Sequence, residues 1–110
     1  MRGDFEIRNL VLLSLRPEAR DFLQPRLTTK RLSLGQVLYE DGAAFTHAIF
    51  PHEGVISLHA DAKDGRGVEK ASIGYEGFVG LALIMGGDEA ISQSTVAVPG
   101  YASWLSLRDL

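Results

Sequence analysis

Few side chains in this sequence could support metal chemistry, and their spacing is informative. The chain has three histidines, His47, His52 and His59, and no cysteine. A metal site built on one strand needs two histidines a single residue apart, because only alternate residues share a face. That spacing is absent. Although Glu53 follows His52, neighbours on an extended chain point to opposite faces. We therefore predict no bound metal and no cofactor.

Nucleophilic and hydrolytic chemistry also lack a local signature. The absence of cysteine excludes disulfides, thiolate zinc sites, cysteine nucleophiles and cysteine-ligated iron–sulfur clusters. The local sequence shows neither a serine with a histidine base nor a pair of carboxylates placed for acid–base work. We expect no catalytic residues and a function other than catalysis.

The composition indicates one cytoplasmic domain over residues 1–110. A chain of 110 residues with 45% hydrophobic content can bury a single core. Its most apolar stretch, Leu10 to Leu15, is flanked by Arg8 and Arg16 and is far too short to span a membrane. The charged amino terminus does not fit a secretory signal. We expect a protein that stays in the cytoplasm, with no membrane partner.

The charge balance argues against DNA binding by these residues alone. Eleven lysines and arginines against fourteen acidic residues give a net charge of −3. The basic stretch between Arg16 and Arg31 is interrupted by Glu18 and Asp21, so we interpret it as an ordinary solvated face. Residues 1–110 are not expected to bind duplex DNA specifically.

The first quarter of the chain is predicted to be helical. Ile7, Leu10, Val11 and Leu15 are spaced as one apolar helical stripe, which Pro17 ends. A second short helix should begin at Pro17, a residue favoured at a first helical position, and should end near Leu23.

From Leu27 onward, short runs separated by turn residues are typical of an antiparallel sandwich or barrel. Turns are expected at Pro51 with Gly54 and at Pro99-Gly100, and a hairpin is expected around residues 63–67. The apolar segment 77–87 breaks this rhythm and predicts a short buried helix. The predicted strands are 28–34, 36–39, 46–50, 54–61, 67–73, 90–98 and 101–107.

Several motifs follow one another in a recognisable order. They are Asn9 to Leu15, Leu34 to Leu38 with Asp41-Gly42, Ile49 to Pro51 with Glu53 to Leu58, Ile73 to Gly80, and Ala102 to Leu110. Together they resemble the effector domain of the Crp/Fnr family of bacterial transcription regulators. The resemblance implies a mainly β fold, an antiparallel double-stranded β-roll of jelly-roll type with short amino-terminal helices and one short internal helix. A generic jelly roll of the cupin type remains the alternative, because each motif occurs in many β proteins.

The resemblance also implies where a ligand would bind. In the family, a glycine-rich loop and the following helix hold the phosphate of a cyclic nucleotide, and the matching residues are Gly77, Phe78, Val79, Gly80 and Leu81. Family members that bind nucleotides have a glutamate where this chain has Leu81 and an arginine near Ser92. Both are missing, so tight cyclic AMP binding is not expected. Neutral hydrogen bonds could come from Ser92, Gln93, Ser94 and Thr95, about half of which should face water.

The implied function is effector sensing for a transcription regulator. Relatives carry a long dimerisation helix and a winged helix-turn-helix after this domain, which we expect beyond residue 110. The expected partners are therefore a small-molecule effector, a second copy of the full-length protein, and DNA through that carboxy-terminal domain alone. Two alternatives stay open: a stand-alone cupin-like ligand-binding or enzyme domain, and a roll that binds nothing and serves as a dimer scaffold.

Overall fold

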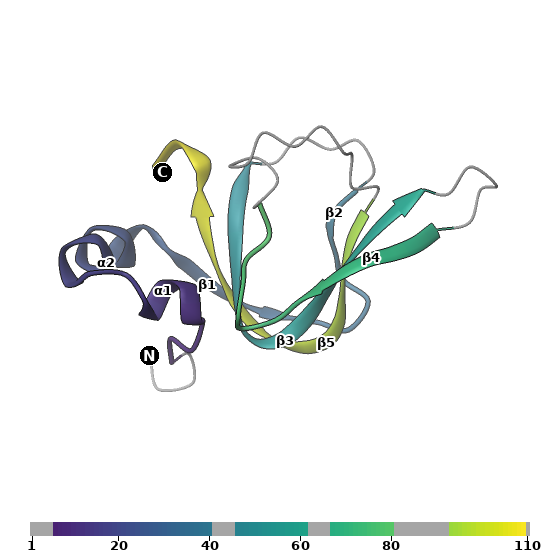
Figure 1. Ribbon diagram of the computed structural model, residues 1–110, viewed down its shortest axis with the longest axis horizontal. Helices are drawn as coiled ribbons and strands as arrows, with labels where there is room; N and C mark the ends of the chain where they lie inside the picture. Colours follow the sequence, from purple (N-terminus) through teal and green to yellow (C-terminus); the bar gives the residue numbers. More distant parts are fainter. Residues whose placement is uncertain (1–5, 41–45, 62–66, 81–92, 110) are drawn as a thin grey trace.

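The computed structural model describes residues 6–40, 46–61, 67–80 and 93–109 (Figure 1). Its helical elements are α1 (Leu10–Leu13), α2 (Pro17–Leu23) and two short 3-10 helices, η1 (Gln24–Arg26) and η2 (Leu107–Asp109). Its strands are β1 (Thr28–Leu32), β2 (Val37–Tyr39), β3 (His47–Asp61), β4 (Gly67–Ile73) and β5 (Gln93–Ser106).

The strands form one antiparallel sheet that curves into a roll. The order across it is β1-β5-β3-β4, and β2 pairs with the other end of β5. In Figure 1 the sheet bends sharply where β3 and β5 cross its lower edge, so that both strands run through both limbs of the roll. The predicted mainly β, antiparallel roll is therefore confirmed.

Two predicted turns are wrong, because the chain bends there without leaving the sheet. β3 continues through Pro51 and Gly54, and β5 continues through Pro99-Gly100. The pairing of β3 with β5 shifts register between Pro51 and Ile56, which is how bulges increase the local bend. A Cβ added at Gly100 would lie 2.1 Å from the carbonyl oxygen of Glu53, so glycine lets the two backbones approach at the bend.

The described residues form two apolar clusters, one on each face of the sheet. The first fills the inside of the roll and consists of Leu32, Ile49, Ile56, Leu58, Val79, Val96 and Ala102. The second lies under the helices and consists of Leu12, Ala48, Phe50 and Leu105. Ile49 belongs to the inner cluster and its neighbours Ala48 and Phe50 to the outer one, as strand alternation requires. Both faces of this part of β3 are therefore buried.

Helix α1 is shorter than predicted and differs in phase. It spans Leu10–Leu13 and begins at Asn9, whose side chain accepts hydrogen bonds from the amides of Val11 and Leu12. Leu12 is buried, whereas Leu10, which we placed on the apolar stripe, is 49% exposed. The stripe was wrong at this position because Ile7 precedes the helix and so does not fix its phase. Helix α2 has the predicted bounds.

Other predictions fall partly or wholly outside the described residues. These are the helix expected within 77–87, of which residues 81–87 are not described, the tip of the β3–β4 hairpin, and the start of the strand predicted from residue 90. The arms of the hairpin pair from Ile56 with Ile73 to Asp61 with Gly67, as predicted. Among the helices of the described ranges, none has the length and apolar character needed to cross a bilayer.

Candidate ligand-binding site

The glycine-rich loop that follows β4 is held against two other elements. Gly77 closes a turn by donating to the carbonyl of Gly74 at 3.2 Å. Its own carbonyl accepts a hydrogen bond from Asn9 Nδ2 at 2.7 Å. Two residues on, Val79 bridges to Ile49, and the two residues exchange both backbone hydrogen bonds at 2.9 and 3.1 Å. The glycine-rich loop predicted to bind a ligand is thus fixed to β3 and to the residue that caps α1.

These bonds decide what each loop residue can offer a ligand. The amide of Val79 already donates to Ile49, so it cannot also point at a phosphate, although its side chain faces the interior of the roll. Phe78 points to the opposite face and stacks on Phe50 with ring centroids 5.0 Å apart. Gly80 has a φ of +120°, a conformation that favours glycine. Leu81 lies outside the described residues.

The strand residues predicted to face the pocket divide between the two faces of β5. Ser94 is 1% exposed and pairs with Leu58 of the inner cluster. Thr95 pairs with Ser57 on the other face, where its hydroxyl lies 3.5 Å from His59 Nε2. Gln93 donates to Glu40 at 3.4 Å. Ser94 is therefore the described member of this group that faces the roll interior, whereas Ser92 lies outside the described residues.

The hydroxyl of Ser94 is buried and has no hydrogen-bond partner within the described part of the chain. Most buried polar groups in proteins are paired, and a hydroxyl left unpaired costs about 1–3 kcal/mol. The Ser94 hydroxyl lies on the inner face of the roll, beside Val96 of the inner cluster. It could therefore form a hydrogen bond with a polar atom of a ligand.

Few charged groups of the described residues lie near the inner cluster. Lys30 of β1 places its ammonium 4.9 Å from the ring centroid of Trp104, and Trp104 packs against the inner cluster. Within residues 6–40, 46–61, 67–80 and 93–109, no three histidine or acidic side chains gather closely enough to hold a metal ion.

Asn9 links three elements, a role that we did not predict. Its side chain is fully buried, and Nδ2 donates to the carbonyls of Pro51 and Gly77, each at 2.7 Å. Its Oδ1 accepts from the amides of Val11 and Leu12, so one side chain joins β3, the loop and α1. The capping function could have been read from asparagine before an apolar run, but its two long-range contacts could not.

His52 makes a second unpredicted link between the amino-terminal segment and the sheet. It is 3% exposed, and its Nδ1 accepts from the backbone amides of Arg8 and Asn9 at 3.0 and 3.1 Å. Its Nε2 lies 2.8 Å from the hydroxyl of Ser103. Because Nδ1 accepts two bonds, the proton of the neutral ring sits on Nε2 and is donated to Ser103. Burial lowers the pKa of His52 from its ordinary value, which favours this neutral form.

Comparison with solved structures identifies the fold. The N-terminal domain of a transcriptional regulator from Streptomyces coelicolor A3(2) superimposes with a TM-score of 0.76 at 22% identity, over 94% of this chain and 73% of that one. A cyclic nucleotide-binding-like protein from Brucella abortus gives 0.71 at 20% identity, over 94% and 91%. The catabolite activator protein of Thermus thermophilus gives 0.70 at 15% identity, over 87% of this chain and 45% of that one.

These structural similarities define the class of fold: this chain has the fold of a cyclic-nucleotide-binding β-roll. More particularly, the roll is of the kind found in the regulatory domains of Crp/Fnr-type regulators, which is the resemblance seen in the sequence. No protein-family model matches the chain, and no curated protein matches it in sequence. At these identities the likeness establishes the fold, and the chain spans less than half of the Thermus activator.

Proposed function

We propose that this chain is the effector-sensing domain of a transcription regulator and that it is not an enzyme. Its effector would bind inside the roll, between the loop ending at Gly80 and the inner face of β5. The set of residues predicted for ligand binding is Gly77, Phe78, Val79, Gly80, Leu81, Ser92, Gln93, Ser94 and Thr95, of which Thr95 lies on the other face of β5 and would not contact the effector directly. Within that set Ser94 would contact the effector directly, and Phe78 and Val79 would fix the loop. DNA reading and dimerisation would belong to further parts of the full-length protein.

The buried, unpartnered hydroxyl of Ser94 carries this proposal. It supports a ligand with a hydrogen-bonding atom on an otherwise apolar surface, because the neighbouring inner-wall residues Leu58 and Val96 are hydrocarbon. A phosphate is disfavoured, since between Arg66 and Arg108 the sequence has a single basic residue, Lys70. The effector should therefore be a neutral or weakly polar small molecule.

Cyclic AMP should bind weakly. The family's glutamate and arginine would each supply a charge-assisted contact of about 1.5–3 kcal/mol. Losing both removes about 3–6 kcal/mol, which corresponds to roughly a hundredfold to ten-thousandfold in affinity. Isothermal titration calorimetry with cyclic AMP measures this directly. A dissociation constant below about ten micromolar would contradict the expectation.

A paired substitution tests where the effector binds. Compounds are first screened by thermal shift, where a ligand at a hundred times its dissociation constant adds about 2.7 kcal/mol of stability. For any hit, Ser94→Ala should weaken binding about tenfold, the effect of one lost hydrogen bond of about 1.4 kcal/mol. Thr95→Ala, the same loss of a hydroxyl on the other face, should leave binding within about twofold. Equal effects of the two variants would exclude the interior of the roll, and a screen without hits would favour an inert scaffold.

A further inference from the structure

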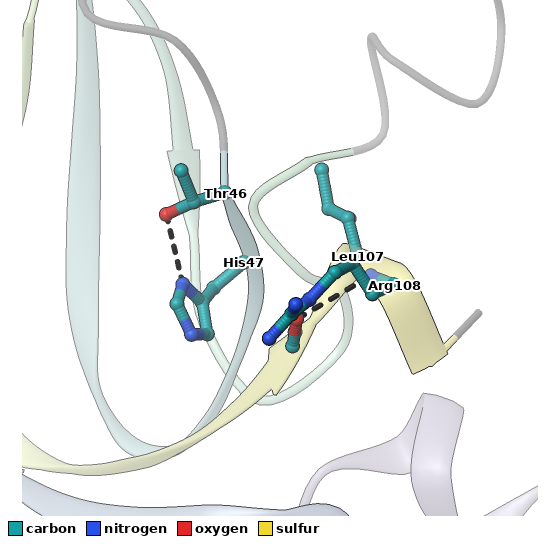
Figure 2. A pocket seen from close by; sticks show the side chains of 5 residues that line it. Thr46, His47, Leu107 and Arg108 are labelled. Atoms are coloured by element: carbon teal, nitrogen blue, oxygen red, sulfur yellow. Dashed lines mark hydrogen bonds between the residues drawn. The ribbon is translucent and has the colours of Figure 1, made fainter.

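A cavity lies where β3 begins and β5 ends, and none of its described lining residues belongs to the proposed effector site. It encloses about 500 Å³ and is lined by Thr46, His47, Ser106, Leu107 and Arg108 (Figure 2). Its two walls are joined by the pairing of His47 with Ser106 and by a hydrogen bond of 3.0 Å from the amide of Leu107 to the carbonyl of Thr46.

After the hydrogen bonds among the lining residues are formed, several of these residues still have a proton to donate. Ser106 Oγ accepts from the amide of Arg108 at 3.3 Å, which leaves its own proton to be donated elsewhere. His47 Nδ1 lies 2.8 Å from the hydroxyl of Thr46. Whichever of these two atoms donates, one donor remains free: either the Nε2 proton of His47 or the hydroxyl proton of Thr46.

Arg108 adds a permanent positive charge. Its side chain extends from η2 towards His47 in Figure 2, and η2 ends at Asp109. Across the residues that the structure describes, no carboxylate forms an ion pair with its guanidinium. Guanidinium presents five N–H donors and no acceptor, and hydrogen bonds from it to an anion are about twice as strong as neutral ones.

We propose that this cavity binds the oxyanion group, phosphate or carboxylate, of a small molecule. Arg108 would pair with the charge, and the Ser106 hydroxyl together with the one free donor of the Thr46–His47 pair on the opposite wall would complete the contact. Among the described residues that line the cavity none is acidic, and its volume leaves room for the rest of a small metabolite beyond one phosphate. An anion held in this way bridges the start of β3 and η2.

The test uses the simplest probes, inorganic phosphate and acetate, titrated separately at constant ionic strength. Backbone and side-chain NMR shifts of Thr46, His47, Ser106 and Arg108 report on the cavity. Saturable shifts with phosphate alone identify phosphate as the chemistry that the site selects, and saturable shifts with acetate as well identify a general oxyanion site. Either result supports the proposal. The absence of saturation with both probes at concentrations of roughly tens of millimolar overturns it.

Two variants separate a built site from general charge attraction. Arg108→Gln should weaken the fitted affinity about tenfold or more, whereas Arg16→Gln, which removes the same charge at an exposed position on the helical side, should change it less than about twofold. Equal weakening by both overturns the proposal. Ser94→Ala should leave the phosphate titration unchanged, so failure of the effector-site proposal would be seen separately from failure of this one.

Discussion

Replacing Asn9 by aspartate makes the smallest change in shape and one of the largest in hydrogen bonding. The new side chain keeps the size of asparagine and the oxygen that caps α1. It loses the Nδ2 group that donates to the carbonyls of Pro51 and Gly77, each at 2.7 Å. A carboxylate oxygen takes its place and faces two carbonyl oxygens in a fully buried position.

The cost can be worked from these two contacts. Each buried carbonyl left without its donor costs about 1–3 kcal/mol, so the pair costs about 2–6 kcal/mol before any repulsion is counted. Domains of this size are stable by only about 5–15 kcal/mol. At about 4 °C per kcal/mol, the melting temperature should fall by roughly 8 °C or more.

Urea unfolding at neutral pH, followed by far-UV circular dichroism, measures this loss. Gln24→Glu is the matched control, because it makes the same amide-to-carboxylate change at an exposed position and should cost less than about 0.5 kcal/mol. If Asn9→Asp unfolds within about 0.5 kcal/mol of the wild type, then the side chain does not join the loop to β3 as described.

Two further predictions concern His52 and the glycines of the bend. Because burial lowers the pKa of His52, the unfolded chain binds more protons just below its ordinary pKa of 6.5. Stability should therefore be complete above about pH 6.5 and should fall as the pH drops towards the folded-state pKa, by at most about 1.4 kcal/mol per pH unit. His52→Gln should lose this slope in acid–urea titrations, and an unchanged slope would assign it to other groups. Gly100→Ala should prevent folding or cost more than about 4 kcal/mol, because its Cβ would meet Glu53 O at 2.1 Å. Gly35→Ala, where φ is +81° but nothing lies within 4 Å, should cost only about 1–2 kcal/mol. Thermal melts of the two glycine variants measure both costs.

Local chemistry was enough to predict much of the fold. Proline at the start of α2 and the alternating apolar residues of the β3–β4 hairpin gave correct elements, because their signals lie within a few residues of sequence. Pro51 with Gly54 and Pro99-Gly100 misled us. The same residues that make a turn also allow two strands to bend across each other, and which of these occurs depends on the partner strand.

The candidate site was predictable in part for the same reason. Strand alternation predicted that about half of Ser92 to Thr95 would face away from the interior, but it could not say which half, since that depends on the register with β3. The cavity at His47 and Arg108 gave no sequence signal. Its walls come together only through the pairing of β3 with β5, and sequence spacing does not reveal that register.

The position of β5 in the sheet constrains how the chain can fold as it is synthesised. β5 is the last of the described strands to be made, yet it lies between β1 and β3 and also pairs with β2. Thr28 finds its partner only when Trp104 arrives. Among the described pairings, only the β3–β4 hairpin and the Ile49–Val79 bridge can form before β5 leaves the ribosome. Until then, β1 and β2 have unpaired backbone edges. We therefore expect the roll to close slowly and late, with its strands pairing nearly simultaneously, and the unfinished chain to need protection from aggregation.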